Sequence, residues 1–153
     1  MLKYEEKEFK NISSDDLGLE TEEEKKVAEK QVEENKDLLS FIRDSLDGKV
    51  KQVILSQRLK SHPVCLSTEG AISMEMEKVL NAMPNDQKVK AERVLEINAN
   101  HPIFKTLGEL YDMDKDKLKE YAELLYTQAL LIEGVTIEDP LAFSNRICNL
   151  MTK

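Results

Sequence analysis

Hydrophobic residues recur at helical spacing in the first third of the chain, on an otherwise polar background. Thr21 and Glu24 form the pattern of a capping box, in which each side chain bonds a free backbone N–H of the first helical turn. Gly48 lies where a helix end is expected. We therefore predict one long helix from Thr21 to about residue 46. Its single apolar stripe consists of Ala28, Val32, Leu39, Ile42 and Leu46.

After Gly48 the pattern changes to short runs rich in β-branched residues. Residues 50–55 (VKQVIL), 63–67 (PVCLS) and 93–98 (RVLEIN) each have the composition of a strand. In the third run apolar residues alternate around Glu96, as in a strand with one buried face. We predict a small three-stranded sheet, with an amphipathic helix inserted between its second and third strands.

The chain is helical again after residue 100. One helix opens at His101-Pro102, and a longer one spans residues 117–133. Asp139 as N-cap and Pro140 at the first helical position begin the last helix, which runs to about residue 151. The fold class is therefore α+β: an N-terminal long helix, a small three-stranded sheet with an inserted amphipathic helix, and a C-terminal three-helix bundle.

The inserted helix, over residues 71–83, carries three methionines. Met74 falls on its polar side, beside Glu77 and Lys78. The apolar stripe on the other side consists of Ile72, Met76, Val79, Leu80 and Met83. That stripe is either a face packed in the core, with Met74 as a stray, or a surface that contacts another molecule.

The last two helices carry more apolar surface than a small domain is expected to cover. The second half of the 117–133 helix is apolar on nearly every side, and the final helix has two adjoining apolar stripes. Two helices from each of two copies would form a four-helix bundle about a twofold axis. The alternative is that both stripes pack inside one chain. The residues expected at the contact between copies are Leu124, Ala129, Leu131, Ile132, Leu141, Phe143, Ile147, Leu150 and Met151.

Charge and cysteine usage narrow the class of protein. The net charge of −8 disfavours nucleic acid and anionic membranes as partners. Residues 1–48 hold 15 acidic and 8 basic side chains, so the acidity belongs to the leading segment. Cys65 and Cys148 match no metal or redox spacing, and no apolar run approaches the roughly 18 residues of a membrane span. We expect a cytoplasmic protein, and the strand-like start around Phe9 suggests a piece of a longer chain.

The sequence offers little for catalysis. None of its five glycines is spaced as a phosphate-binding loop. His62 and His101 have no carboxylate or cysteine partner at ligand spacing, and Ser67 and Ser73 lie in no nucleophile motif. We predict no catalytic residue, no metal site and no enzyme activity for this chain.

Three stretches resemble the C-terminal domain of the heat-shock protein 90 family of chaperones. The stretches are the run SQRL at 56–59 followed by Pro63, Ser67-Thr68 and SMEMEKVL; VLEINANHPI at 94–103; and, most specific, LLYTQALLIEGVTIEDPLAFSNRICNLM at 124–151. The likeness covers nearly everything from Thr21 onward, and residues near 4–20 resemble the close of the family's middle domain. On this basis residues 1–20 end a preceding domain and its linker, and residues 21–153 form a C-terminal dimerisation domain.

The resemblance implies part of an ATP-driven homodimeric clamp. The last two helices would form the constitutive dimer contact, and ATP and magnesium would bind an N-terminal domain outside this sequence, so no cofactor is expected here. The helix over residues 72–83 would contact unfolded or partly folded client proteins, since unbranched, polarizable methionine adapts to many surfaces. The client-contact residues implied are Ile72, Met74, Met76, Val79, Leu80 and Met83.

The chain's last residues bear on the branch of the family. Eukaryotic cytosolic relatives end in an acidic Met-Glu-Glu-Val-Asp tail that recruits co-chaperones, whereas this sequence ends Leu-Met-Thr-Lys. The resemblance therefore favours the bacterial branch and implies no tail-docking co-chaperone. Two other functional classes stay open: a passive helical adaptor that dimerises and binds one defined protein partner, and an enzyme fragment of unknown chemistry.

Overall fold

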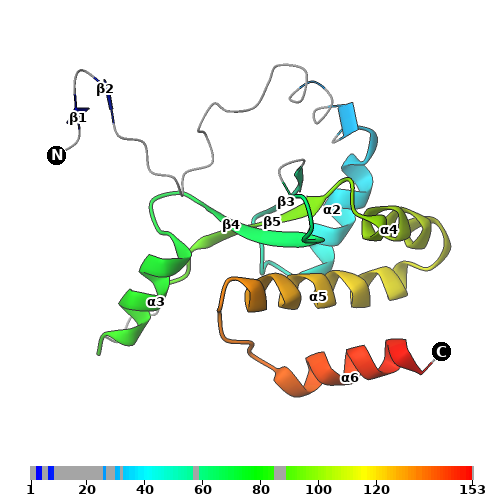
Figure 1. Ribbon diagram of the computed structural model, residues 1–153. Helices are drawn as coiled ribbons and strands as arrows, with labels where there is room; N and C mark the ends of the chain where they lie inside the picture. Colours follow the sequence, from blue (N-terminus) through cyan, green and yellow to red (C-terminus); the bar gives the residue numbers. More distant parts are fainter. Residues whose placement is uncertain are drawn as a thin grey trace.

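The computed structural model of the chain describes residues 3–4, 7–8, 26, 30–31, 33–56, 59–84 and 89–152. A small sheet lies at the centre, and helices α2 (Lys36–Ser45), α4 (Pro102–Met113) and α5 (Lys115–Ile132) pack around it and each other (Figure 1). Helix α3 (Met74–Ala82) projects from one end of the sheet, and α6 (Pro140–Met151) lies alongside α5 on the side away from the sheet. The α+β class is confirmed.

The central sheet contains the three strands that the sequence predicted. Its order is β3 (Gln52–Ser56), β5 (Glu92–Asn98), β4 (Val64–Glu69), with β3 parallel and β4 antiparallel to β5. A separate antiparallel pair joins β1 (Lys3–Tyr4) to β2 (Lys7–Glu8), while the strand expected around Phe9 lies outside the described residues.

The central strand β5 differs from its expected pattern. We predicted one buried face and a polar Glu96, but every residue from Val94 to Asn98 is buried, and Glu96 is only 2% exposed. The reason is position: β5 has a partner strand on each side, and helices α2 and α5 pack over its neighbours. This central strand is covered on both faces, so the alternation of apolar and polar residues in its sequence does not predict which of its side chains are exposed.

Helix α2 begins at Lys36, and the described residues before it, 26, 30–31 and 33–34, are also helical. Asn35, with φ −110° and ψ 14°, is a turn residue between them, but the helical hydrogen bonds continue across it: the Asn35 N–H donates to the Gln31 carbonyl oxygen at 3.1 Å, and the Leu39 N–H donates to the Asn35 carbonyl oxygen at 3.0 Å. The Asn35 side chain also donates to the Gln31 carbonyl oxygen, across 2.8 Å. The expected end is confirmed, because Gly48 has a φ of 78°. The predicted capping box and the stripe residues Ala28 and Val32 lie outside the described residues.

Two of the three C-terminal helices, α4 and α6, begin at the residues predicted for them. The Nδ1 atom of His101 accepts from the Ile103 N–H at 3.2 Å, and an Asp139 side-chain oxygen accepts from the Ala142 N–H at 2.9 Å. Helix α5 starts two residues earlier than expected, because Asp114 is its N-cap and accepts from the Lys117 N–H at 3.1 Å.

One aliphatic core joins the helices to the sheet. Its fully buried members come from α2 and its C-cap, from strands β4 and β5, and from helices α4 and α5. They include Ile42, Leu46, Val64, Leu95, Ile97, Leu107 and Leu118. The stripe of α5 made by Leu118, Ala122, Leu125 and Ala129 lies in this core. For that stripe, the alternative of packing within one chain is therefore correct.

Candidate functional site

Helix α3 is defined by local signals at both ends. The Ser73 side chain caps it, accepting from the Met76 N–H at 3.1 Å, and Glu75 and Glu77 in the first turn suit the positive end of the helix dipole. Met83 leaves the helical conformation, with a ψ of 145°, directly before Pro84. The expected helix is confirmed with somewhat shorter bounds.

The apolar stripe of α3 faces outward. Met76, Val79 and Met83 are 47%, 56% and 51% exposed, and no residue of the helix is fully buried. Packing of this stripe in the core is therefore wrong for these three residues in the single chain. Ile72 and Leu80 are half-buried. Met74, expected as a stray on the polar side, instead packs against the core.

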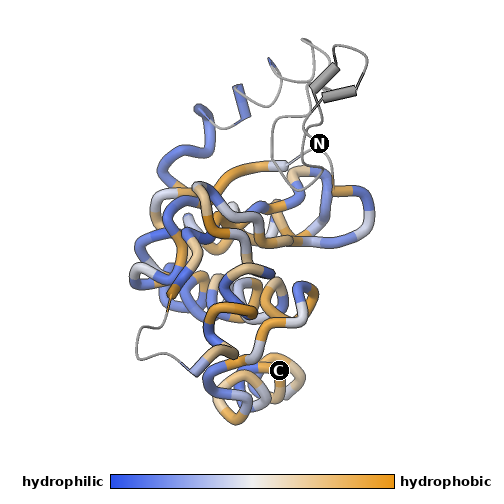
Figure 2. Tube along the Cα trace, turned by 90° about the vertical axis from the view of Figure 1, so that its left-hand side faces the viewer, coloured by the Kyte–Doolittle hydropathy of each residue, from blue (hydrophilic) through white to orange (hydrophobic). Residues whose placement is uncertain are grey.

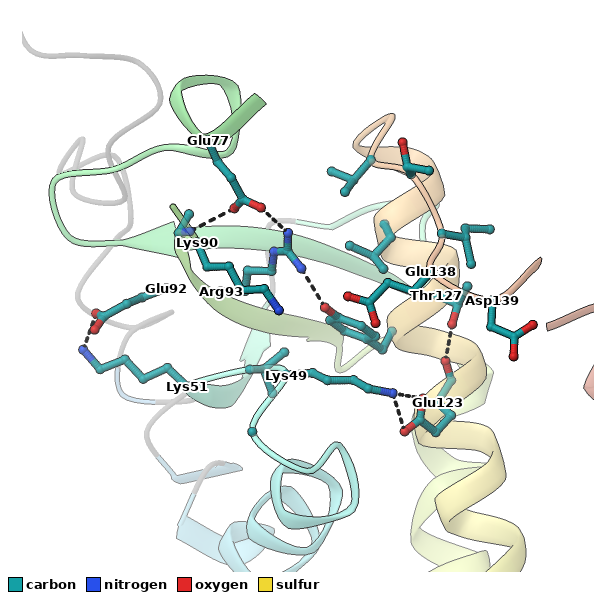
Figure 3. A pocket seen from close by; sticks show the side chains of 18 of the residues that line it. Lys49, Lys51, Glu77, Lys90, Glu92, Arg93, Glu123, Thr127, Glu138 and Asp139 are labelled. Carbon is teal, nitrogen blue, oxygen red and sulfur yellow. Dashed lines mark hydrogen bonds and ion pairs between the residues drawn. The ribbon is translucent and has the colours of Figure 1, made fainter. Parts of the chain in front are cut away.

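The polar side of α3 faces the body of the protein. One Glu77 carboxylate oxygen lies 2.8 Å from an Arg93 Nη on β5, and the other accepts from the Ala91 N–H at 2.9 Å. The second Nη of Arg93 donates to the Tyr126 hydroxyl on α5 across 2.9 Å (Figure 3). A carboxylate on α3 is thus joined through one guanidinium to the long helix α5.

Two further polar contacts attach the same side of α3. The Lys78 Nζ donates to the Glu133 carbonyl oxygen, at the C-cap of α5, across 2.7 Å. The Asn81 side chain donates to the Val89 carbonyl oxygen at 2.9 Å and accepts from the Val89 N–H at 3.0 Å. We call the contacts of Glu77 and Lys78 with Arg93, Tyr126 and Glu133 the α3 clamp.

A cleft of about 990 Å³ lies beside the α3 clamp, between α3, the ends of β3 and β5, α5 and the segment leading into α6 (Figure 3). Its charged side chains are largely paired: Lys49 lies 2.7 Å from Glu123, and Lys51 lies 2.8 Å from Glu92. Hydrogen bonds to Glu92 and then to Glu69 raise the pKa of Lys51 above its ordinary value of 10.5. No His, Cys or Ser is among the described residues that line the cleft.

A second uncovered face lies on α6 and the end of α5. Leu141 and Met151 are 72% and 77% exposed, Leu131 and Ile132 are also exposed, and α6 has no fully buried residue. Among the described elements, α6 packs closely against α5 alone. Figure 2 shows hydrophobic positions recurring along α6 at this end of the molecule. We call Leu131, Ile132, Leu141 and Met151 the α5–α6 face.

The residues predicted at a dimer contact divide into three groups. Leu131, Ile132, Leu141 and Met151 are exposed, while Phe143, Ile147 and Leu150 are half-buried beside α5. Ala129 is fully buried and Leu124 is 6% exposed, so these two present little surface to a partner. Ala129 belongs to the hydrophobic core of the chain, whereas Leu124 is buried outside that core.

The α3 clamp was not predicted from the sequence. Glu77 and Arg93 are 16 residues apart, and Arg93 and Tyr126 are 33 apart, so no helical or strand periodicity links them. The one available signal was the polar side of α3 itself.

Two kinds of feature, a membrane-spanning helix and a metal-binding cluster, are absent from the described residues. None of the described helices has the length and hydrophobicity needed to span a membrane. Within the same residues, His, Cys, Asp and Glu side chains form no group of three that could hold a metal ion.

Comparisons with known proteins place the chain in context. A family model described as Hsp90 protein matches residues 1–153. Chaperone protein HtpG of Clostridium botulinum (strain Loch Maree / Type A3) is 58% identical over 151 residues, which is 99% of this chain and 24% of that protein. Proteins of the same name from Alkaliphilus metalliredigens and Bacillus subtilis (strain 168) are 56% and 55% identical, over 99% and 97% of this chain. The chain spans 24% of the length of each of these relatives.

Proposed function

This chain belongs to the Hsp90 family, and we propose that it serves as a dimerisation and client-contact region of an ATP-dependent chaperone in that family. Two uncovered apolar faces on separate elements support this proposal: the outward stripe of α3 and the α5–α6 face. Exposed apolar side chains that gather on one element often mark a place where another protein binds.

The α5–α6 face is the observation that carries the dimer proposal. Helix α6 has twelve residues, none of them buried, and closely contacts a single described helix. A helix with so little packing gains stability from a second partner, and two α5–α6 pairs related by a twofold axis would supply it. Burial of three or four large aliphatic side chains per copy contributes roughly 5–10 kcal/mol before the costs of association.

Molar mass in solution tests the dimer. We expect the chain to be a dimer by light scattering at low micromolar concentration, and the double variant Leu131→Glu/Leu141→Glu to be a monomer. Both side chains are exposed in the single chain, so these changes should leave its fold intact, as circular dichroism would show. Met113→Glu, at an 85% exposed position on α4, is the matched control. A monomeric wild-type chain, or a dimeric double variant, would contradict the proposal.

The outward stripe of α3 is the proposed client-contact surface. Met76 and Met83 are flexible and polarizable, and Val79 lies between them on the same exposed side. Such a surface can bind many unfolded segments weakly, because methionine repacks around different shapes. Unfolded or partly folded proteins are therefore the proposed partners.

The alternative, a dimeric adaptor for one defined partner, is favoured by the fixed attachment of α3. A helix held by several hydrogen bonds is pre-organised, which suits a single groove. The breadth of binding separates the two proposals. Comparable affinity for several unrelated unfolded proteins supports the chaperone, whereas binding of only one supports the adaptor.

ATP hydrolysis is proposed to belong to the parent chaperone outside these residues. The isolated chain is therefore expected to hydrolyse no ATP above background, and turnover that survives repurification would contradict this. A cytoplasmic location is proposed because Cys65 and Cys148 match no metal or redox spacing in the sequence.

A further inference from the structure

Helix α3 is attached mainly by polar contacts: it buries no residue fully, no described element packs closely against it, and Met74 is its one described residue among those packed against the core. We propose that Glu77, Lys78 and Arg93 are positioning residues for client contact: through the α3 clamp they fix the orientation of α3 relative to α5. This inference rests on the proposed function of the α3 stripe. It adds that the orientation of the stripe is set by contacts with α5, the same helix that contributes to the α5–α6 face.

The first attachment is a shielded ion pair. Glu77 and Arg93 lie 2.8 Å apart, and each side chain is only 12% exposed. The second oxygen of Glu77 is also occupied, by the Ala91 N–H. Charge-assisted hydrogen bonds at low exposure are stronger than surface pairs, which salt and side-chain entropy weaken. This carboxylate is therefore held in one position on β5.

Arg93 extends that attachment to α5. Its Nη1 donates to the hydroxyl of Tyr126, a residue that is 5% exposed and belongs to the core. Arg93 Nε is buried and has no hydrogen-bond partner among the described residues, so the guanidinium is held on this side by its two Nη groups. Loss of either acceptor would leave a buried cation poorly satisfied, which is costly.

The second attachment lies at the C-terminal end of α5. Lys78 Nζ donates to the Glu133 carbonyl oxygen, one of the carbonyl groups that a helix end leaves without an internal partner. A cation there also suits the negative end of the helix dipole. Just beyond Glu133 the chain turns at Gly134, whose φ is 63°, and continues toward α6.

The separation of the two attachments along α5 fixes the orientation of α3. Tyr126 and Glu133 are seven residues apart, so they lie on nearly the same side of α5, about 10 Å apart along its axis. Glu77 and Lys78 are adjacent on α3. Two attachments separated along α5 resist rotation of α3, whereas a single one would act as a pivot. The outward aim of Met76 and Val79 follows from this constraint.

The test combines a local readout with a binding readout. The variant is Arg93→Met/Lys78→Met, and the control is Lys49→Met, which removes a cation and an ion pair from the same cleft without touching α3. Amide hydrogen exchange over residues 74–82 reports the attachment of α3 directly. Binding of reduced, carboxymethylated α-lactalbumin, followed by fluorescence anisotropy, reports contact with an unfolded chain.

The double variant should exchange the amides of α3 about tenfold faster or more, because two charge-assisted contacts are lost. It should bind the probe about fivefold more weakly and keep the molar mass of the wild type. The single variant Arg93→Lys, which retains a cation beside Glu77, should keep part of the wild-type protection of the α3 amides against exchange. Lys49→Met should match the wild type in both readouts.

The outcomes separate this inference from the proposed function. Wild-type exchange rates over α3 in the double variant would overturn the clamp, whatever the binding result. Faster exchange with unchanged probe binding would also overturn it, because the clamp would then not position the client surface. If the wild type did not bind the probe, client contact would be contradicted, whereas the exchange rates would still decide whether the clamp holds α3.

Discussion

Met74 and Met76 lie two residues apart on α3 and face opposite environments. Met74 packs against the hydrophobic core, whereas Met76 is 47% exposed. The same element therefore carries one methionine that contributes to folding and another that is available to a partner. Substitutions at the two positions should have different consequences, and that difference is the basis of the first prediction.

The double substitution Met76→Gln/Val79→Gln is expected to weaken binding of an unfolded chain about tenfold, since it removes the exposed apolar surface of α3. Gln retains good helix propensity, so the melting temperature should change little. Met74→Gln should instead lower the free energy of unfolding by about 1–3 kcal/mol, because it places an amide against the core. Anisotropy titrations and thermal melts measure the two effects.

Met113→Gln is the control for that experiment, because Met113 is exposed on α4, away from the proposed surface. Equal loss of binding in the control would show that the effect is not specific to α3. Unchanged binding in Met76→Gln/Val79→Gln would rule out this stripe as the client contact.

The N-cap of α6 provides a second prediction. Asp139→Ala removes the side-chain acceptor for the Ala142 N–H and should destabilise α6 by about 1 kcal/mol. If dimerisation orders α6, this loss of helix stability should raise the dimer dissociation constant about fivefold, as measured by sedimentation equilibrium.

Asp114→Ala removes the corresponding cap of α5, which already packs in the core of one chain. It should lower the free energy of unfolding by a similar amount and leave the dimer dissociation constant unchanged. An identical effect of the two substitutions on dimerisation would argue against α6 as the contact element.

Two glycines provide a third prediction of opposite sign. Gly48 has a φ of 78°, so Gly48→Ala should lower the free energy of unfolding by about 1 kcal/mol or more, although nothing lies within 4 Å of the added Cβ. Gly108 lies inside α4, and there too the added Cβ meets nothing within 4 Å. Gly108→Ala should therefore stabilise the protein by about 1 kcal/mol. Urea unfolding of both variants would show whether the signs differ.

The pKa of Lys51 leads to a fourth prediction. Because hydrogen bonds to Glu92 and Glu69 raise its pKa in the folded state, its contribution to stability is fully present below its ordinary pKa of 10.5 and is lost as the pH rises through the folded value. Lys51→Met should thus be less stable than the wild type at pH 8. The gap should narrow as the pH is raised above 10.5.

Urea unfolding at both pH values measures that gap, with Lys105→Met as the control. Lys105 lies 3.8 Å from Glu109 in an exposed pair on α4, so its removal controls for the general loss of a positive charge. A gap for Lys51→Met that stays constant with pH would contradict the assignment.

Much of the fold was accessible from the sequence because it depends on neighbours along the chain. Caps such as Asp139, the β-branched runs of the three strands and the glycine that ends α2 act within a few residues of where they stand. Element boundaries shifted by only a few residues. At Asn35, whose side chain bonds the Gln31 carbonyl oxygen, the backbone dihedral angles depart from helical values although the helical hydrogen bonds continue.

The candidate site was less accessible. Periodicity correctly divided α3 into an apolar and a polar side and placed Met74 with the polar residues. It did not show which side faces the protein, because that depends on Arg93 and on the C-terminal end of α5, both distant in sequence. For the same reason Ala129 was assigned to a dimer contact although it is fully covered within the chain.

The sequence by itself determined the elements, their order and the family, since propensity, capping and motif identity are properties of short segments. Tertiary structure alone decided that α3 turns its methionine stripe outward, and that Leu118, Ala122, Leu125 and Ala129 of α5 are covered within one chain whereas Leu141 and Met151 of α6 are exposed. The sequence of a segment shows which of its faces is apolar. Which face is covered depends on the charges and surfaces that distant segments bring beside it, and on α3 an ion pair and a lysine bound to a helix end outweigh the usual preference for burying the apolar side.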